Sequence, residues 1–468
     1  MSSPPSAPLG AAEIARQVRD GSLSATGSVG RALAAIDACG ALNAVTELHA
    51  DRALKRAEAL ERARAAGRDP GPLAGVPFAV KNLFDVAGRV TRAGSRATEA
   101  TPPAPRDAFA IRALEAAGAI LVASTNMDEL AYGFSGENAH DGDCRNPHDP
   151  ARSPGGSSSG SAALVAAGAV PLALGTDTNG SVRVPAALCG VAGLKPTYGL
   201  VSRSGVVPFV RSLDHVGVFA RGAGDLALAL GALRGMDPDD PVQRPRAATP
   251  APDTLRAARL GGWFAAPLHP DAAAALEDAA QVLGATATRD LPLAEEARAA
   301  AFILTTAEGG QAHLAALAAH PDRFGPLVRD RLRAGALVPA VWVGRAQALR
   351  RRLCAQLAAA LDGVDVLLAP ATPCPAFPLG TETHRVAGGD LPIRLGIGMF
   401  TQPLTPSGLP IAVVARRGAD SGLPVGVQII ARAGAEAGAL AAAARLEGAG
   451  FTVPPALPEP APPEPSNA

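Results

Sequence analysis

The stretch Ala119-Ile-Leu-Val-Ala-Ser124 decides how the chain folds. Its residues are small or apolar, which is typical of a short buried strand. Residues 108–117 before it favour a helix, and Asn126-x-x-Glu129 after it fits a capping box that opens another helix. Because helices and strands alternate in this way, the sequence predicts βαβ units. We expect an α/β fold with a central mixed, largely parallel sheet covered by helices on both faces.

The composition changes along the chain on either side of this segment. Short apolar runs alternate with Gly- and Ser-rich turns from residue 71 to about residue 235. Residues 237–256 are rich in Pro, Asp and Arg and indicate a surface connection, and residues 270–361 have helical spacing. Strand patterns then resume at 364–368, 410–415 and 423–430.

Strand patterns on both sides of a helical stretch favour one domain with an insertion over several domains in series. We expect this domain over residues 71–450, with the helical insertion at about 257–361. A helical segment over 1–70, interrupted near 21–28, precedes the domain. A Pro-rich, disordered tail over 451–468 follows it.

The composition excludes several classes of protein. The 43 basic and 43 acidic residues cancel, which argues against nucleic-acid or anionic-membrane partners. No apolar run is long enough to span a membrane, and there is no secretory signal, so we expect a cytoplasmic protein. The five cysteines and eight histidines show no metal-ligand spacing, so we expect neither a metal nor a cofactor. Forty of the basic residues are arginines and three are lysines.

One of these lysines ends an apolar strand pattern, Gly75-Val-Pro-Phe-Ala-Val-Lys81. A buried amine loses its charge more readily than an exposed one, so Lys81 is a candidate base. The alternative is a lysine that reaches the surface or pairs with Asp85.

A Gly- and Ser-rich loop, Ser153-Pro-Gly-Gly-Ser-Ser-Ser-Gly-Ser161, runs directly into a helix pattern at 162–167. Glycine lets the backbone approach a ligand closely, and a helix N-terminus offers free N–H groups. The alternatives are a phosphate-binding loop, as in a non-enzymatic nucleotide-binding protein, or a flexible turn. The loop lacks the lysine that a nucleotide-binding P-loop carries after its last glycine. A nucleotide site is therefore a weak alternative.

A third segment, Gly175-Thr-Asp-Thr-Asn-Gly-Ser181-Val-Arg183, follows a strand pattern at 170–174. Its backbone N–H groups are placed to converge on one oxygen, as an oxyanion hole requires. A serine after glycine is otherwise an ordinary turn residue.

Together these segments resemble the amidase signature family. The family pattern G-[GAV]-S-[GS]-[GS]-G is met at residues 155–160, and D-x-[GA]-x-S-[LIVM]-R-x-P is met at residues 177–185 except that Asn179 replaces Gly or Ala. Ser157 lies 76 residues after Lys81 and 24 before Ser181, as in the family's triad. The resemblance extends from about residue 73 to residue 447.

The resemblance implies a Ser–Ser–Lys triad that hydrolyses an amide through an acyl-enzyme and releases ammonia. Ser181 would be the nucleophile, Ser157, on a cis peptide, the bridging serine, and Lys81 the base. The implied oxyanion hole consists of the N–H groups of Thr178, Asn179, Gly180 and Ser181, and the implied supporting residues are Ser158, Asp177 and Arg183. The Asn179 side chain would contact substrate, or only tolerate a left-handed turn. Lys195, outside the triad, is expected in a structural ion pair.

Within the family, the chain most resembles enzymes that remove ammonia from a small carboxylated urea derivative. This resemblance implies a small amide or ureido substrate, a small helical companion subunit, and a homodimer or heterotetramer. The alternative within the family is the glutaminase subunit of an amidotransferase that acts on glutamyl-tRNA. Gene neighbours would separate these two interpretations.

Overall fold

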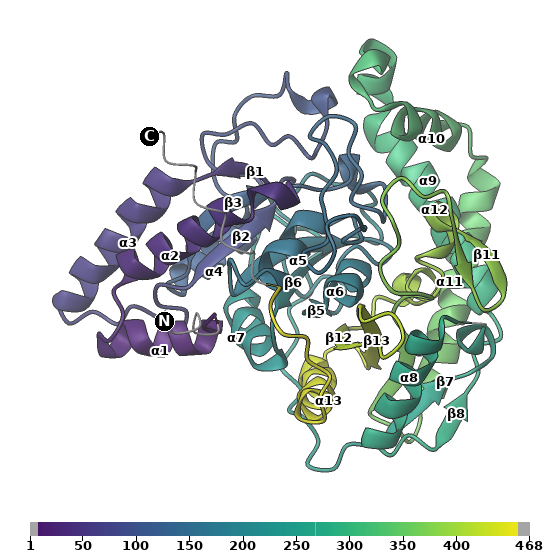
Figure 1. Cartoon of the computed structure of the whole chain (residues 1–468). Coiled ribbons are helices and arrows are strands. Elements are labelled where there is room, and N and C mark those ends of the chain that lie inside the picture. Colours follow the sequence, from purple (N-terminus) through teal and green to yellow (C-terminus); the bar gives the residue numbers. More distant parts are fainter. Residues whose placement is uncertain (1–7, 267, 457–468) are drawn as a thin grey trace, which may run out of the picture.

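The computed structural model describes residues 8–266 and 268–456, and within them a large mixed sheet forms the centre of the molecule (Figure 1). The predicted tail over 451–468 lies mostly outside the described residues, and the part that is described, up to residue 456, has no regular secondary structure. The sheet's strands, in spatial order, are β1 (Val45–Leu48), β3 (Ile120–Thr125), β2 (Pro77–Lys81), β4 (Leu172–Asp177), β6 (His215–Ala220), β5 (Ala192–Lys195), β12 (Ile411–Arg417), β13 (Pro424–Ala431), β9 (Val366–Pro370), β7 (Ala257–Leu260) and β8 (Ala287–Arg289).

Parallel pairing holds in two flanks of this sheet. Strand β2 pairs in parallel with β3 and β4, and β7 pairs in parallel with β8 and β9. The central strands from β4 to β9 are antiparallel to their neighbours, as is the edge strand β1 to β3. The βαβ units expected from the sequence therefore account for the flanks. A separate hairpin is formed by β10 (Thr383–Val386) and β11 (Gly389–Pro392).

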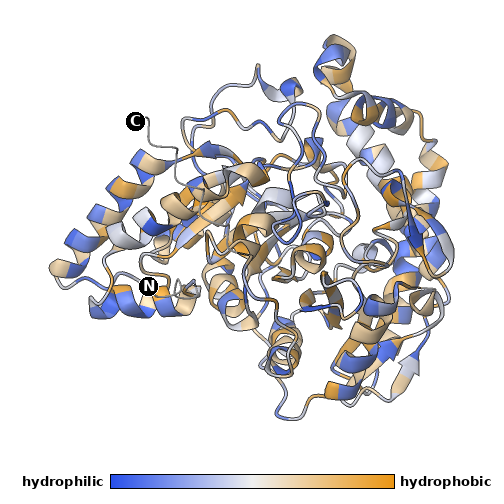
Figure 2. Ribbon diagram, in the orientation of Figure 1, coloured by the Kyte–Doolittle hydropathy of each residue, from blue (hydrophilic) through white to orange (hydrophobic). Residues whose placement is uncertain are grey.

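Helices cover both faces of the sheet, as expected. On one face lie α5 (Ser159–Ala166) and α6 (Arg183–Cys189); a Cβ on Gly426 of β13 would lie 2.5 Å from the Cβ of Ala187 in α6. The next residue, Val427, points to the opposite face and joins a core with apolar residues of α13. That second layer consists of α4 (Phe109–Ala116), α7 (Ala223–Leu233), α13 (Glu436–Gly448) and α8 (Pro270–Val282). The strands between the layers are predominantly hydrophobic (Figure 2).

The N-terminal segment contains a strand as well as helices. Helix α1 (Ala11–Asp20) ends at Gly21, and α2 (Ala25–Ala38) starts after Ser24, whose hydroxyl caps it, so the expected interruption is present. Strand β1 then joins the sheet edge before α3 (Ala50–Ala65). Thus 1–70 is not helical throughout, because this short stretch pairs with β3.

The predicted helical insertion also contributes strands. Residues 257–361 form two long helices, α9 (Ala294–Ala319) and α11 (Ala340–Ala360), and the shorter α10 (Pro326–Ala336) in addition to α8. Strands β7 and β8, which also lie within residues 257–361, extend the sheet beyond β9. The predicted insertion therefore shares the sheet of the domain. The remaining short elements are η1 (Gly40–Leu42), η2 (Arg96–Thr98), η3 (Glu129–Ala131), η4 (Gly262–Ala265), η5 (Pro321–Arg323), α12 (Ile393–Gly396) and η6 (Gln402–Ser407).

The capping box predicted at Asn126-x-x-Glu129 is wrong. Only the single turn η3 forms there, because Leu130 and the next residue adopt left-handed φ values of 52° and 60°. The Asn126 amide donates to the carbonyls of Asn43 and Gly142, and Glu129 accepts the N–H of Gly325. Both side chains thus tie distant loops together rather than starting a helix.

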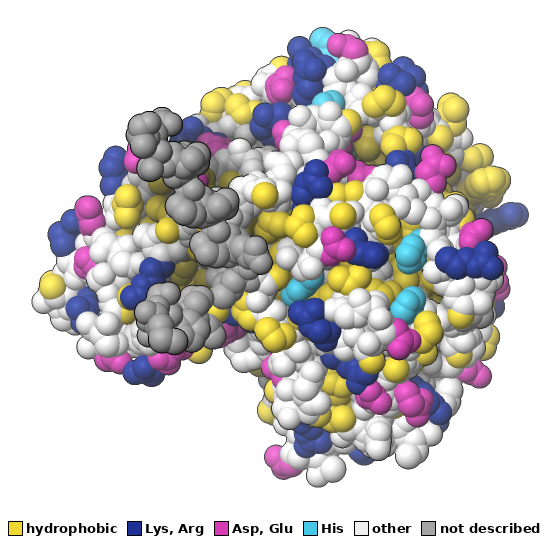
Figure 3. All heavy atoms as spheres, in the orientation of Figure 1, with side chains coloured by type: hydrophobic (Ala, Val, Ile, Leu, Met, Phe, Trp, Pro, Cys, Tyr) yellow, Lys and Arg dark blue, Asp and Glu magenta, His cyan; other side chains and the backbone are white. Residues whose placement is uncertain are grey.

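The surface carries interspersed charges of both signs. On the face shown in Figure 3, basic and acidic side chains alternate with apolar ones, without a large patch of one sign. None of the helices in the described residues is long and apolar enough to cross a membrane. The five cysteines are free.

Candidate active site

Lys81 ends strand β2 in the interior of the protein. Because β2 and β4 run parallel, with Val80 opposite Leu174, their carboxyl ends lie side by side. The fully buried Lys81 Nζ donates to Ser157 Oγ at 2.7 Å and to Thr176 Oγ1 of β4 at 2.9 Å. Asp85, the expected alternative partner, instead accepts the hydroxyl of Thr91. The structure therefore joins Lys81 to the Gly- and Ser-rich loop.

Burial determines the charge of this lysine. It lowers the pKa of Lys81 to about 7, although the carboxylates of Asp128, Asp214 and Asp177 oppose the shift. Among the described residues, Lys81 donates to two hydroxyls and forms no ion pair that would hold it in its charged form. A large fraction of the amine is therefore neutral near pH 7 and able to accept a proton from Ser157.

Ser157 lies on the loop that leads into α5 and is fully buried. The Gly156–Ser157 peptide is cis, as the resemblance implied. Only glycine fits at 156, since a Cβ there would lie 1.9 Å from Asp128 Oδ2. The Ser158 N–H donates to the carbonyl of Ser181 at 3.3 Å, and the Ser158 hydroxyl donates to the Thr176 carbonyl at 3.2 Å. Ser158 thus fastens the loop to the segment that carries Ser181.

Ser181 lies two residues before α6 and lines a pocket. Ser181 is 3% exposed. In the described part of the chain, no direct hydrogen bond joins the hydroxyls of Ser157 and Ser181, and their segments are linked through the Ser158 N–H. The structure brings Lys81, Ser157 and Ser181 into one buried region, with Ser181 at the cavity.

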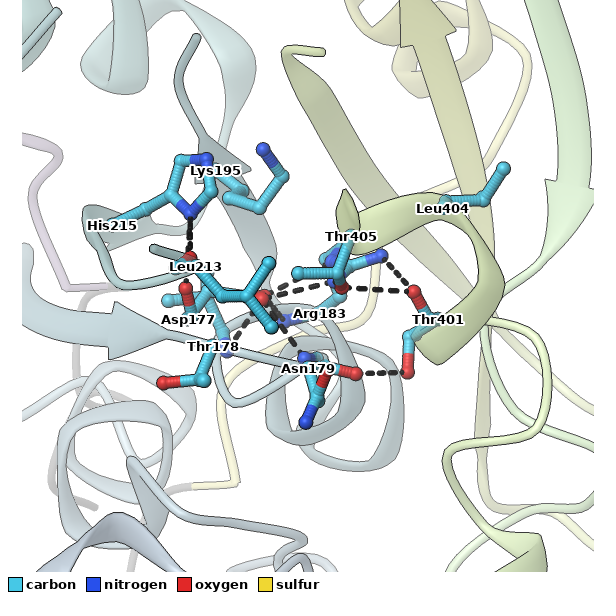
Figure 4. A network of polar contacts seen from close by, with 12 residues as sticks. Asp177, Thr178, Asn179, Arg183, Lys195, Leu213, His215, Thr401, Leu404 and Thr405 are labelled. Carbon is cyan, nitrogen blue, oxygen red and sulfur yellow. Dashed lines mark hydrogen bonds and ion pairs between the residues drawn. The ribbon is translucent and has the colours of Figure 1, made fainter. Parts of the chain in front are cut away.

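An ion pair braces the loop between β4 and α6 (Figure 4). Arg183 donates to both carboxylate oxygens of Asp177 at 2.9 Å, with both side chains fully buried. Arg183 also donates to the Thr401 carbonyl and to Thr405 Oγ1 of η6. Burial would raise the pKa of Asp177, but Arg183 outweighs it and holds that pKa well below its usual value. Asp177 and Arg183 therefore brace the loop between β4 and α6.

The expected set of four oxyanion donors needs a correction. The Gly180 N–H donates to Asp177 Oδ1 at 2.8 Å and is not free to bind substrate. Its φ of 137° turns the chain, and a Cβ at Gly180 would lie 2.3 Å from Thr401 Oγ1. The N–H groups of Asn179 and Ser181 have no acceptor within the described residues. They remain, with that of Thr178, the candidate donors to an oxyanion.

Comparison with known proteins places this arrangement in a family. A family model described as Amidase matches residues 29–440. The chain belongs to the amidase signature family. It is 46% identical over 428 residues to AtzE, the 1-carboxybiuret hydrolase subunit of Pseudomonas sp. (strain ADP), covering 90% of this chain and 94% of that protein. It is 39% identical over 440 residues to a glutamyl-tRNA(Gln) amidotransferase subunit of Anaeromyxobacter sp. (strain K), covering 86% of each chain.

Solved structures of this family show the same fold. One is described as a vestigial protein complex that reveals the evolutionary origins of an s-triazine catabolic enzyme; it has a TM-score of 0.93 and 45% identity, and the match covers 95% of this chain and all of that one. Another, a bacterial aryl acylamidase of the amidase signature family, has a TM-score of 0.85 and 26% identity, with 95% and 97% covered. The protein is accordingly an amidase.

The amidase cavity in front of Ser181 has a volume of about 350 Å³. Its walls come from segments far apart in the sequence: the loop around Tyr132, the Ser181 loop, α9 with Thr305, and α10 with Arg331. The Arg331 guanidinium stacks on the Tyr132 ring, 3.6 Å from its centroid, and donates to the Tyr132 carbonyl at 2.9 Å. These cavity residues of the amidase were not identified from the sequence. Arg331 is one of forty arginines, and no local motif marks Thr305.

Two expectations about individual residues are wrong. Asn179 is not in a left-handed turn, since its φ is not positive; the positive φ in this loop belongs to Gly180. Lys195 forms no ion pair in the described part of the amidase and donates to the carbonyls of Pro196 and Leu409 at 3.1 and 2.6 Å. Burial, together with the neighbouring Arg183, lowers the pKa of Lys195 to about 7. Carbonyls can hold this amine in either protonation state, so it needs no carboxylate partner.

Proposed function

We propose that the chain hydrolyses a small amide through a covalent acyl-enzyme on Ser181. Neutral Lys81 takes the proton of Ser157, and Ser157 takes that of Ser181 as its Oγ attacks the substrate carbonyl carbon. Backbone N–H groups at Asn179 and Ser181 hold the resulting oxyanion. Ser157 returns a proton to the nitrogen, the C–N bond breaks and ammonia leaves. Water then attacks the acyl-enzyme by the same proton route and frees Ser181.

The observation that carries this mechanism is the 2.7 Å contact between Lys81 Nζ and Ser157 Oγ in a fully buried environment. A charged lysine there would be costly and of no use as a base, whereas a neutral one can accept a proton. The Gly- and Ser-rich loop therefore serves amide hydrolysis in this proposal, and not phosphate binding.

We further propose a carboxylated ureido substrate, with 1-carboxybiuret as the best candidate. Arg331 supports this proposal: it lines the cavity, it forms no ion pair with a carboxylate among the described residues, and burial lowers its pKa. A partly buried cation without a counterion favours an anionic ligand. The other cavity arginine, Arg394, already faces Glu137 at 3.7 Å. The 46% identity to a 1-carboxybiuret hydrolase subunit points the same way.

A small helical companion subunit belongs to the same proposal, and so does assembly as a homodimer or, with that companion, as a heterotetramer. The relative at 46% identity is itself named a subunit, and the structure at 45% identity is described as a protein complex. Co-expression with a small open reading frame encoded beside this chain, followed by size-exclusion chromatography with light scattering, tests it. A stable complex supports the proposal, and a monomer under all conditions contradicts it.

The substrate proposal is tested by ammonia release from a panel of 1-carboxybiuret, N-carbamoylglycine, simple amides and glutamine. We expect kcat/KM for 1-carboxybiuret to exceed that for glutamine by about 100-fold, because glutamine would bring an α-ammonium group beside the Arg331 cation whereas 1-carboxybiuret carries none. Ser181→Ala is the control for contaminating activity. Ammonia release from glutamine alone, stimulated by tRNA-binding subunits, would instead favour the amidotransferase interpretation.

A further inference from the structure

The side chain of Asn179 carries a buried polar atom without a partner. Its Oδ1 accepts no hydrogen bond from any described residue, and the residue is 7% exposed. Asn179 lies two residues before Ser181 and lines the same cavity. Tyr132 Oη is also unpartnered there, but its ring lies under the Arg331 guanidinium, at the other wall. Of the two, Asn179 is the group nearest along the chain to the reacting serine.

The orientation of the Asn179 carboxamide is set by its neighbours. Its Nδ2 donates to Thr305 Oγ1 of α9 at 2.7 Å, and its backbone carbonyl accepts the hydroxyl of Thr401 at 2.7 Å. With the nitrogen held by Thr305, the carboxamide presents an acceptor and not a donor to its remaining surroundings. A buried acceptor without a donor destabilises a protein unless water or a ligand supplies the missing hydrogen bond, and a ligand that fills the cavity must then replace the water.

A ureido compound has the donor that this acceptor lacks. In an alkyl amide the scissile carbonyl is flanked by a methylene group, whereas in a ureido acid it is flanked by a second N–H. Asn179 and Ser181 line the same cavity, so a substrate whose carbonyl oxygen binds the N–H groups of these two residues would have the atom next to its carbonyl within reach of the Asn179 side chain. We propose that Asn179 Oδ1 accepts this N–H and selects ureido substrates over alkyl amides, with Thr305 as its positioning residue. This inference rests on the proposed function.

The test compares N-carbamoylglycine with succinamate, two acids that differ by an N–H in place of a CH₂ next to the terminal carboxamide. Both are titrated calorimetrically against the Ser181→Ala protein, so that binding is measured without turnover. We expect N-carbamoylglycine to bind about tenfold more tightly. In the Asn179→Ala, Ser181→Ala double variant this ratio should fall to about one. A distorted loop would weaken the binding of both acids by the same factor and leave the ratio of their affinities unchanged. A change in that ratio therefore reports specifically on the N–H contact.

Thr305 supplies the matched variants on the same Ser181→Ala background. Thr305→Val should lower the binding ratio to about two, and Thr305→Ser, which keeps the hydroxyl, should restore it. A ratio of one in the Ser181→Ala parent, failure of N-carbamoylglycine to bind it, or an unchanged ratio in the Asn179→Ala variant would overturn the inference. These outcomes are separate from the proposed function, which stands or falls on ammonia release by the wild-type protein.

Discussion

At the residue scale, the proposed role of Lys81 as a base predicts a rate that depends on pH. Because burial lowers its pKa to about 7, the amine is protonated and inactive as a base below that pH and neutral above it. We therefore expect kcat/KM for ammonia release to fall about tenfold per pH unit below pH 7 and to level off above it. Rates measured from pH 5 to pH 9, with substrates that do not titrate in this range, check this prediction.

The Lys81→Arg variant separates the role of a base from that of a positive charge. Guanidinium does not lose its proton at usable pH, so the variant should lose activity by a factor of about 10² to 10⁴ at every pH. Wild-type turnover in Lys81→Arg would show that a neutral amine is not required.

The main contribution of Arg183 is to the stability of the folded protein. Arg183→Ala leaves the Asp177 carboxylate buried and uncompensated, and we expect the free energy of unfolding to fall by about 3–5 kcal/mol. Urea denaturation followed by circular dichroism measures this. The double variant Asp177→Asn, Arg183→Met, which removes both charges, should lose less stability than the single variant. A loss below about 1 kcal/mol in Arg183→Ala would mean that the ion pair does not brace the loop.

At the scale of elements, the packing of α9 against α10 positions the cavity wall. The two helices approach closely at Gly310 and Gly335, where a Cβ on Gly335 would lie 2.0 Å from the carbonyl oxygen of Thr306. Since α9 carries Thr305 and α10 carries Arg331, a larger residue at 335 should displace both groups from the cavity.

We expect Gly335→Leu to raise KM for a ureido acid about tenfold and to reduce stability by about 1–3 kcal/mol. The rate at which a fluorophosphonate labels Ser181 should change less than twofold, because the triad lies on other elements. Gly344→Ala in α11, where an added Cβ meets no atom within 4 Å, is the matched control. An unchanged KM in Gly335→Leu would contradict this role of the α9–α10 contact.

Sequence patterns were informative where an element carries its own signal. The short apolar runs at β2, β3 and β4 and the Gly- and Ser-rich loop before α5 were all identified, because burial and turn chemistry act locally. The capping box at Asn126 was misleading, since its side chains satisfy loops that are remote in sequence. Strand β1 was missed because its four residues, three half-buried and one exposed, have too weak a pattern.

Over the whole molecule, the scarcity of lysine has a measurable consequence. Lys81 and Lys195 are fully buried, whereas Lys55 on α3 is exposed. An amine-reactive acetylating reagent should therefore modify Lys55 in the native protein at least about tenfold faster than either buried lysine, and leave activity intact. Peptide mass spectrometry of native and urea-unfolded protein checks this. Rapid acetylation of Lys81 in the folded protein would be inconsistent with its burial.

Only part of the candidate site could be predicted from the sequence. The segments of the proposed triad were identified because each is a compact motif, and the fold brings Lys81 and Ser157 together. Thr176, Thr305 and Arg331 were not identified, because they meet the site only through the sheet register and the crossing of α9 and α10. Which N–H groups remain free for an oxyanion also depended on the bond from Gly180 to Asp177, which no motif specifies.

The central claim is that Ser181 is a nucleophile activated by Lys81 through Ser157. Its most direct test is the rate and position of labelling by a fluorophosphonate, measured by peptide mass spectrometry. We predict a single adduct, on Ser181, formed at least about 100-fold more slowly in Lys81→Ala and Ser157→Ala proteins that remain folded. An adduct on another serine, or wild-type labelling of Ser181 in the Lys81→Ala protein, would contradict the account.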